Sequence, residues 1–301
     1  MTSQGSPSNQ PTSNSDTGTY IVEPRSTHTH TIILLHGLSS NGEKFGKELL
    51  ETGITSGNRT LAQLLPGTRF VFPTAKRRRS TAFNRAILTQ WHDIARLPDP
   101  EYRKQIQLKG LAESAAELET LIREETAKVS PKNVILGGLS QGCGMSLSML
   151  FALEYPLGGF IGMCGYLPFR SDINEAIADD DIEEDEDNPF AADDEDQTSS
   201  TDPAVKALIF ERDLLCLSPV VSPRRENTAQ STPVFLGHGD LDEKKPHRLG
   251  EGAAQTLRAA RYEVMWKLYH GLGHWYKIPD EIDDIVEFIQ KKVGWDISQE
   301  E

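Results

Sequence analysis

The chain has 301 residues, with 45 acidic against 31 basic residues and a formal net charge of −14. This acidity argues against a nucleic-acid-binding protein, and no apolar run approaches the length of a membrane span. Only 37% of the residues are hydrophobic, which is low for a chain that folds throughout, so we expect part of it to lie outside the folded domain.

The first segment, residues 1–19, is expected to be a disordered tail. It consists mostly of Ser, Thr, Gln, Asn, Gly and Pro, a composition that buries too little apolar surface to fold. It has neither the apolar core of a signal peptide nor an Arg-rich amphipathic pattern. Cys143, Cys164 and Cys216 have spacing that fits no disulfide framework. The sequence therefore predicts a cytoplasmic protein, with the nucleus as a second compartment.

Short, continuous apolar runs predict the strands of a sheet. The first, residues 31–35, has the uninterrupted hydrophobicity of a strand that is buried on both faces. Similar runs recur at residues 70–72, 134–136, 160–163, 233–236 and 264–268. Helical patterns lie between several of them, so we expect an α/β fold with a mostly parallel central sheet and helices on both faces. This single domain is expected to span residues 20–297.

A basic cluster follows the apolar run at residues 70–72. Lys76, Arg77, Arg78 and Arg79, with Arg85 nearby, are expected to lie in a loop. We interpret them as solvated charges. An anionic head group, a CoA-like phosphate or the chain's own acidic segment is the alternative partner. The cluster lacks interleaved aromatic residues, so nucleic acid is not expected to bind.

A G-x-S-x-G motif, residues 138–142, lies where the predicted strand at residues 134–136 should turn into a helix. Such a nucleophile elbow holds its serine hydroxyl above the edge of the sheet. The pattern predicts Ser140 as a nucleophile. An oxyanion hole is then expected from the backbone amides of Gln141 and of Leu38, which lies in the loop after the first strand.

An acidic insertion is expected at residues 171–230. Residues 171–202 contain 15 acidic residues and no Lys or Arg, so that the rest of the chain sums to about +1. Such a block repels itself and buries no apolar surface, so it should stay solvated. We interpret it as a passive surface insertion, with a regulatory or partner-binding segment as the alternative.

A serine nucleophile needs a base, and an acid that orients this base. The segment His238-Gly239-Asp240-Leu241-Asp242 follows one predicted strand and supplies the acid, for which Asp242 is favoured and Asp240 competes. The segment Gly271-Leu272-Gly273-His274 follows the next strand and supplies the base, for which His274 is favoured over His270. The order of serine, acid and histidine along the chain is that of the α/β-hydrolases.

These motifs together resemble those of the acyl-protein thioesterase, lysophospholipase and carboxylesterase group of α/β-hydrolases. The segments that carry the resemblance are residues 34–38, 90–94, 135–142, 165–168, 238–242 and 273–274. It covers roughly residues 20–170 and 231–293. The resemblance implies a triad of Ser140, Asp242 and His274 and an oxyanion hole of Leu38 and Gln141. It also implies an acyl-binding site lined near Leu38, Trp91 and Leu167.

The chain departs from the family in three places. Residues 39–42 read Ser-Ser-Asn-Gly where the family usually continues with Gly-Asp, and His92 stands where the family usually has Phe. The insertion replaces a short connection. These changes fall on the expected walls and entrance of the pocket, so they concern the substrate and leave the triad intact.

We therefore expect a serine hydrolase that cleaves carboxylic esters or thioesters through an acyl-enzyme, without a cofactor. The resemblance favours an acyl-protein thioesterase that acts on S-acylated proteins, or a carboxylesterase that acts on small esters. A lysophospholipase is the alternative, and transient contact with a membrane surface is compatible with each. A non-catalytic relative that binds a partner is the alternative of another class. No metal is expected, although His28-x-His30 and His238-x-Asp240-x-Asp242 have partly metal-like spacing.

Overall fold

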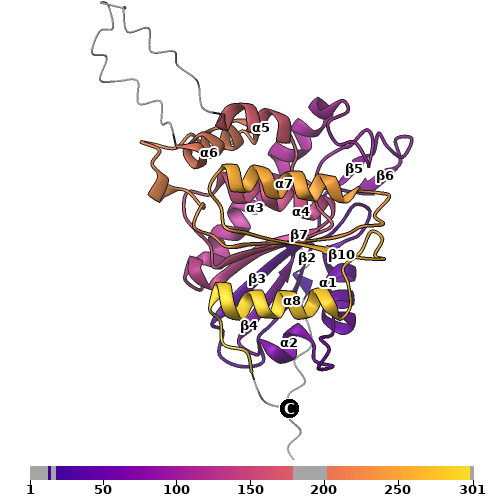
Figure 1. Ribbon diagram of the computed structural model, residues 1–301, viewed down its shortest axis with the longest axis vertical. Coiled ribbons are helices and arrows are strands. Elements are labelled where there is room, and N and C mark those ends of the chain that lie inside the picture. Colours follow the sequence, from indigo (N-terminus) through magenta and orange to yellow (C-terminus); the bar gives the residue numbers. More distant parts are fainter. Residues whose placement is uncertain (1–12, 15–17, 179–201, 299–301) are drawn as a thin grey trace, which may run out of the picture.

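An eight-stranded sheet with the order β1-β2-β4-β3-β7-β8-β9-β10 forms the centre of the computed structural model, which describes residues 13–14, 18–178 and 202–298. Helices cover both faces of the sheet (Figure 1). Every pair of neighbouring strands from β4 to β10 is parallel, whereas β1 and β2 are antiparallel to their neighbours. The predicted α/β fold with a mostly parallel sheet is confirmed.

All six predicted strands are present in this sheet. Its members are β1 (Ser13–Asn14), β2 (Thr19–Val22), β3 (His30–Leu35), β4 (Thr68–Phe72), β7 (Val134–Leu139), β8 (Gly159–Met163), β9 (Val234–Gly239) and β10 (Val264–Tyr269). Two of them, β7 and β9, continue through glycines beyond the apolar runs that predicted them. Their carboxyl ends therefore reach further toward the loops that carry the expected catalytic residues.

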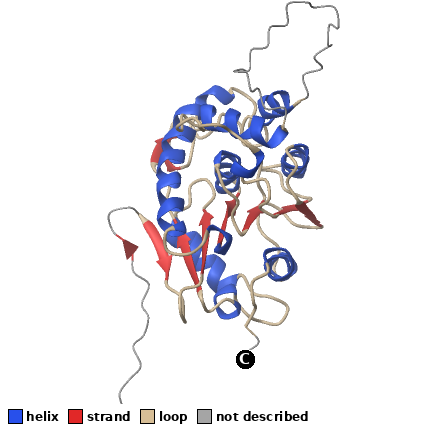
Figure 2. Ribbon diagram, turned by 90° about the vertical axis from the view of Figure 1, so that its left-hand side faces the viewer, coloured by secondary structure: helices blue, strands red, loops and turns tan. Residues whose placement is uncertain are grey.

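Two groups of helices enclose the sheet, and Figure 2 shows the strands as a layer between them. One group consists of α1 (Gly42–Thr52), α2 (Leu61–Leu64) and α8 (Asp280–Phe288). The other consists of α3 (Leu108–Thr126), α4 (Gln141–Ala152), α5 (Arg170–Ile177), α6 (Pro203–Leu214) and α7 (His247–Ala259). Short 3-10 helices lie at Lys104–Gln107, Pro131–Asn133 and Arg225–Asn227, and a π-helical turn lies at Ile289–Val293. Within the described part of the chain, no helix is both long and apolar enough to cross a membrane.

The expected solvated insertion is folded at both of its ends, which corrects the sequence interpretation. Helix α5 buries Ile173 and Ile177, and helix α6 buries Val205 and Leu208. Apolar residues at helical spacing flank the acidic run, and their burial outweighs the charge around them. Residues 179–201, which carry most of the acidic side chains, lie outside the described residues.

Two further boundaries differ from the expectation. Strand β2 begins at Thr19 and pairs with Ser13–Asn14, so the fold reaches into the segment expected to be a tail; the rest of that segment lies outside the described residues. Part of the basic cluster is a strand and not a loop, although Lys76, Arg77, Arg79 and Arg85 are exposed, as the interpretation of solvated charges expected. Strand β5 (Arg77–Arg79) pairs with β6 (Ile87–Thr89), and Arg78 lies 3.0 Å from a carboxylate oxygen of Glu113 on α3.

Helix α6 carries a carboxyl group into the packing between α6 and α4. Glu211 is fully buried. Burial raises the pKa of its carboxyl group well above the usual value, more than the neighbouring Ser148 hydroxyl lowers it. Glu211 is therefore protonated in the folded protein at pH values where the unfolded chain has already lost this proton.

Replacing Glu211 by Gln is expected to stabilise the protein increasingly as the pH rises. Because the folded-state pKa lies above the unfolded value of 4.5, the wild type loses stability from about that pH up to the folded pKa. Glutamine keeps the shape without titrating, so the difference in unfolding free energy should grow by up to about 1.4 kcal/mol per pH unit. Urea denaturation at pH 5 to 8 measures it, with the exposed Glu251→Gln on α7 as control. A pH-independent difference would contradict the assignment.

Candidate active site

Ser140 lies at the sharp turn from β7 into α4, with φ 57° and ψ −115°. Residues other than glycine rarely adopt this backbone conformation, and strain of this kind is typical of functional sites. The neighbouring glycines make the turn possible. A Cβ atom on Gly138 would lie 2.6 Å from the carbonyl oxygen of Leu35, and one on Gly142 would lie 2.2 Å from the same oxygen. The elbow motif therefore needs glycine at both positions.

A continuous chain of hydrogen bonds joins Ser140, His274 and Asp242. The Nε2 atom of His274 lies 2.9 Å from Ser140 Oγ, and its Nδ1 atom lies 2.7 Å from Asp242 Oδ2. Asp242 follows β9 and His274 follows β10. Since β7, β8, β9 and β10 lie side by side in this order and are parallel, all three side chains meet at the carboxyl edge of the sheet. The structure thus brings together the three residues that the sequence singled out.

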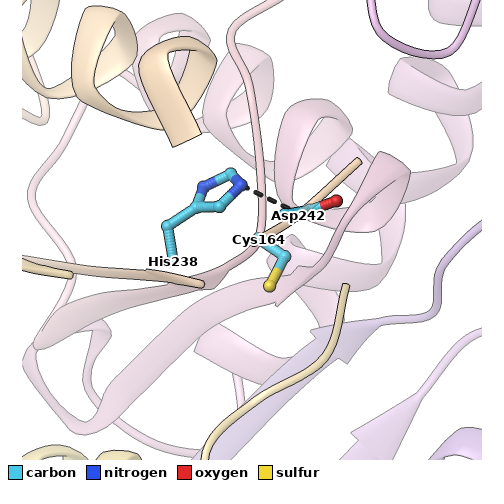
Figure 3. Close-up of side chains that lie close together, drawn as sticks. All are labelled: Cys164, His238 and Asp242. Atoms are coloured by element: carbon cyan, nitrogen blue, oxygen red, sulfur yellow. Dashed lines mark hydrogen bonds and ion pairs between the residues drawn. The ribbon is translucent and has the colours of Figure 1, made fainter. Parts of the chain in front are cut away.

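Four hydrogen bonds hold the carboxylate of Asp242. Its Oδ1 atom accepts from the backbone amides of Lys244 (3.0 Å) and Lys245 (2.8 Å). Its Oδ2 atom is shared by His274 and by His238 Nε2, which lies 3.1 Å away (Figure 3). Burial opposes the charge, but the hydrogen bonds from His238 and His274 outweigh it and lower the pKa of Asp242 below its usual range. An ionised Asp242 keeps the proton of His274 on Nδ1, so that Nε2 is free to accept one from Ser140.

The competing residues Asp240 and His270 pair with each other. His270 Nδ1 lies 2.9 Å from Asp240 Oδ2, and the amide of Gly271 donates to Asp240 Oδ1 at 2.8 Å. The side chain of His270 is 86% exposed. This pair connects the loops after β9 and β10 at the surface, while Asp242 and His274 from the same loops face Ser140.

Two buried residues beside Asp242 were not assigned to the site from the sequence. His238 Nε2 also lies 2.7 Å from the carbonyl oxygen of Lys245, and Cys164 Sγ donates to the carbonyl oxygen of Trp275 at 3.0 Å. One ligand atom from each of Cys164, His238 and Asp242 lies within 4.8 Å of the other two (Figure 3). Burial raises the pKa of the Cys164 thiol well above its usual value. His238 Nε2 is bonded to Asp242 Oδ2 while the Cys164 thiol donates to Trp275, so it is His238 that supports the carboxylate. The signals for His238 in the sequence were its place at the end of β9 and the partly metal-like His-x-Asp-x-Asp spacing, and neither indicated this supporting contact.

The loop after β3 passes directly beside Ser140. A Cβ atom on Gly37 would lie 3.5 Å from Ser140 Cβ. His36 shapes this loop from within, because its Nδ1 lies 2.7 Å from the Gly37 carbonyl oxygen and its Nε2 accepts from the amide of Ala75 at 3.0 Å. Leu38 follows in the same loop, and Gln141 is the first residue of α4, where amides have no intrahelical partner. Both residues line the same pocket as Ser140 and His274.

A pocket of about 470 Å³ opens over Ser140. Its apolar lining comes from Leu38, Phe45, Phe83, Ile94, Leu97, Leu139 and Trp275. Tyr166, Lys244 and Lys245 complete one side. Pockets of this size and apolar character suit an acyl chain whose carbonyl group lies at the serine.

The structure places neither Trp91 nor Leu167 on the wall of this pocket, which corrects the expectation that they line it. Both side chains are 2% exposed and pack within the core. The indole Nε1 of Trp91 donates to the carbonyl oxygen of His36 at 2.9 Å, so Trp91 supports the loop of Leu38 from behind. Tyr166 precedes Leu167 and takes the position on the wall. The motif located the right region, but orientation depends on tertiary packing.

Comparisons with known proteins agree with this geometry. The family described as Phospholipase/Carboxylesterase matches residues 17–181 and 198–293. Acyl-protein thioesterase 1 of Saccharomyces cerevisiae is 27% identical over 270 residues, which cover 88% of this chain and 93% of the relative. Acyl-protein thioesterase 1 of Yarrowia lipolytica is 24% identical, covering 90% and 96%. The crystal structure of Zea mays acyl-protein thioesterase 2 has the same fold, with a TM-score of 0.61 at 24% identity, covering 92% and 99%.

Replacing Trp91 by Phe is expected to lower kcat for p-nitrophenyl butyrate about tenfold with little change in KM. The phenyl ring keeps most of the packing but cannot donate to His36, so the loop beside Ser140 loses its fixed position. Trp295→Phe is the matched control, because the Trp295 indole Nε1 has no hydrogen-bond partner among the described residues and stacks on His30 instead. A change confined to KM, or in the preferred acyl length, would place Trp91 on the substrate side instead.

Proposed function

The chain belongs to the phospholipase/carboxylesterase family, and from this premise we propose that it hydrolyses thioesters and carboxylic esters through an acyl-enzyme on Ser140. The observation that carries the proposal is the pair of hydrogen bonds from Asp242 through His274 to Ser140 at the mouth of an apolar pocket. A binding module would not need an ionised carboxylate, a correctly oriented imidazole and a strained serine in one line.

The proposed reaction uses His274 twice. As Ser140 Oγ attacks the carbonyl carbon, its proton passes to His274 Nε2, and ionised Asp242 stabilises the imidazolium that forms. The amides of Leu38 and Gln141 donate to the oxyanion of the tetrahedral intermediate. His274 then gives the proton to the departing thiol or alcohol. Water, activated by the same imidazole, attacks the acyl-enzyme and releases the carboxylic acid. Water is the only co-reactant that these steps need.

Thioesters of S-acylated proteins are the substrate class that we propose first. The support is that this chain matches two proteins named acyl-protein thioesterase 1 over most of their length. The pocket agrees, because Phe83 lines it and is also 44% exposed, which offers apolar surface to an acyl chain that enters from outside. We place this activity in the cytoplasm, since the three cysteines are free.

A fluorophosphonate probe is expected to label the wild type and not Ser140→Ala, because the probe reacts only with an activated serine hydroxyl. The same pair of proteins should be compared on an S-palmitoylated peptide, a long-chain thioester, a lysolipid and a short ester. We expect turnover of the thioesters by the wild type alone. Labelling that persists in the variant would refute Ser140 as the nucleophile, whereas a wild type that neither reacts with the probe nor turns over any substrate would indicate a binding protein.

Replacing Asp242 by Asn is expected to lower kcat by about 10³ to 10⁴, because the amide no longer fixes the proton of His274 on Nδ1. The matched change Asp240→Asn removes the same charge from the same loop, yet the Asp240 carboxylate accepts from His270 and the Gly271 amide at the surface and not from His274. It should cost less than about tenfold. Steady-state hydrolysis of p-nitrophenyl butyrate by both variants measures the contrast, and equal losses would contradict the assignment of the acid.

A further inference from the structure

A lysine lies buried in the wall of the pocket, where a charged group is costly. Lys245 is 2% exposed and lines the same cavity as Ser140. Its ammonium Nζ has no hydrogen-bond partner among the described residues. It lies over the ring of Tyr166, 3.9 Å from the centroid, which is a weak substitute for an anion. Leaving an ammonium group unpaired in such a place is strongly unfavourable unless something compensates for it.

The neighbouring groups cannot provide this compensation. The two oxygens of Asp242 already accept four hydrogen bonds, so this carboxylate attracts Lys245 from nearby without pairing with it. The Tyr166 hydroxyl is engaged with His92 Nε2 at 3.1 Å. Burial lowers the pKa of His92 to about 4, so the ring is neutral, and an imidazole carries no negative charge in either of these protonation states. Burial also lowers the pKa of Lys245 to about 7, more than Asp242 raises it.

The described lining of the cavity supplies no anion, so an anion that pairs with Lys245 would have to come from the substrate. The lining residues that the structure describes include no Asp or Glu. The loss of water from the Lys245 ammonium occurs on folding, so a ligand does not incur that part of the cost again when it binds. A carboxylate that entered the cavity would form a charge-assisted hydrogen bond in surroundings of low polarity, where such bonds are strongest.

We propose that Lys245 is a specificity-determining residue that binds a carboxylate of the substrate, so that the enzyme prefers thioesters and esters that carry a second, ionised carboxyl group. This inference rests on the proposed function, because it names the substrate class of the same pocket. The carboxylate belongs either to the acyl part or to the leaving thiol or alcohol. The chemistry is the same in both cases, and the experiment separates them.

Two matched pairs of substrates test the two positions of the carboxylate. In the first pair, the S-ethyl monothioester of adipic acid is compared with S-ethyl hexanethioate, which has a methyl group in place of the carboxylate. In the second, the hexanoyl thioester of 3-mercaptopropionate is compared with that of propanethiol. The readout is the ratio of kcat/KM between the two substrates of a pair. A substitution at Lys245 that changes the reactivity of the triad through Asp242 alters both values equally, so its effect cancels from the ratio.

The wild type is expected to favour the carboxylate in one of the two pairs by about tenfold, which corresponds to about 1.4 kcal/mol. In Lys245→Met, which has a similar length but no charge, the ratio should fall to about one. Lys245→Gln tests the same ratio if the Met variant fails to fold. Lys244→Met is the matched control, since Lys244 is exposed, lines the same pocket and removes the same formal charge. Its ratio should remain that of the wild type.

Three outcomes would overturn the proposal. These are a wild-type ratio near or below one in both pairs, a preference that survives in Lys245→Met or Lys245→Gln, and an equal loss of preference in Lys244→Met. The urea midpoint of Lys245→Met should be equal to or above that of the wild type, because an unpaired buried charge has been removed. If the wild type hydrolyses none of the thioesters, or Ser140→Ala hydrolyses them, the proposed function fails instead.

Discussion

The geometry of the site depends on the close approach of the amino end of α4 to the carboxyl end of β3. A Cβ atom on Gly142 would lie 2.2 Å from the carbonyl oxygen of Leu35 and 2.6 Å from that of His36, so only a glycine allows this backbone contact. The contact brings the loop of Leu38 beside Ser140 and holds the elbow in its strained conformation. Two proposed oxyanion donors from distant parts of the sequence thereby face one point, because the packing of backbone on backbone leaves little freedom.

A second set of interactions fixes this contact from behind. The side chain of Gln141 accepts from the backbone amide of Trp91 at 3.0 Å and donates to the carbonyl oxygen of His92 at 2.8 Å. Trp91 in turn donates to His36, so hydrogen bonds connect the elbow to the Trp91 segment and this segment to the loop after β3. Such a network keeps donors in place before the substrate arrives, which is the condition for strong stabilisation of a developing charge.

The sequence predicted those parts of the protein that depend on local patterns. Apolar runs identified six of the eight strands of the central sheet, and glycines around Ser140 identified the elbow, because both features are dictated by neighbours in the chain. The residues that were misjudged depend on contacts between distant segments. Trp91 and Leu167 lie in the right region, yet packing turns their side chains inward. The acidic run concealed helix α5, whose Ile173 and Ile177 are buried while α5 packs against α6 and α7. No pattern in the sequence indicates that Lys245 is buried while Lys244 is exposed.

Lys245 joins the catalytic part of the site to the part that would select the substrate. Its backbone amide donates to Asp242, and its carbonyl oxygen accepts from His238, whereas its Nζ lies over the ring of Tyr166 in the wall of the pocket. The backbone contacts do not depend on which side chain the residue carries. A change of side chain at this position can therefore alter the charge of the pocket while the hydrogen bonds to Asp242 remain. Position 245 is consequently a place where substrate specificity can change separately from the chemistry at Ser140. The limit to this separation is the electrostatic attraction between Asp242 and the ammonium group of Lys245.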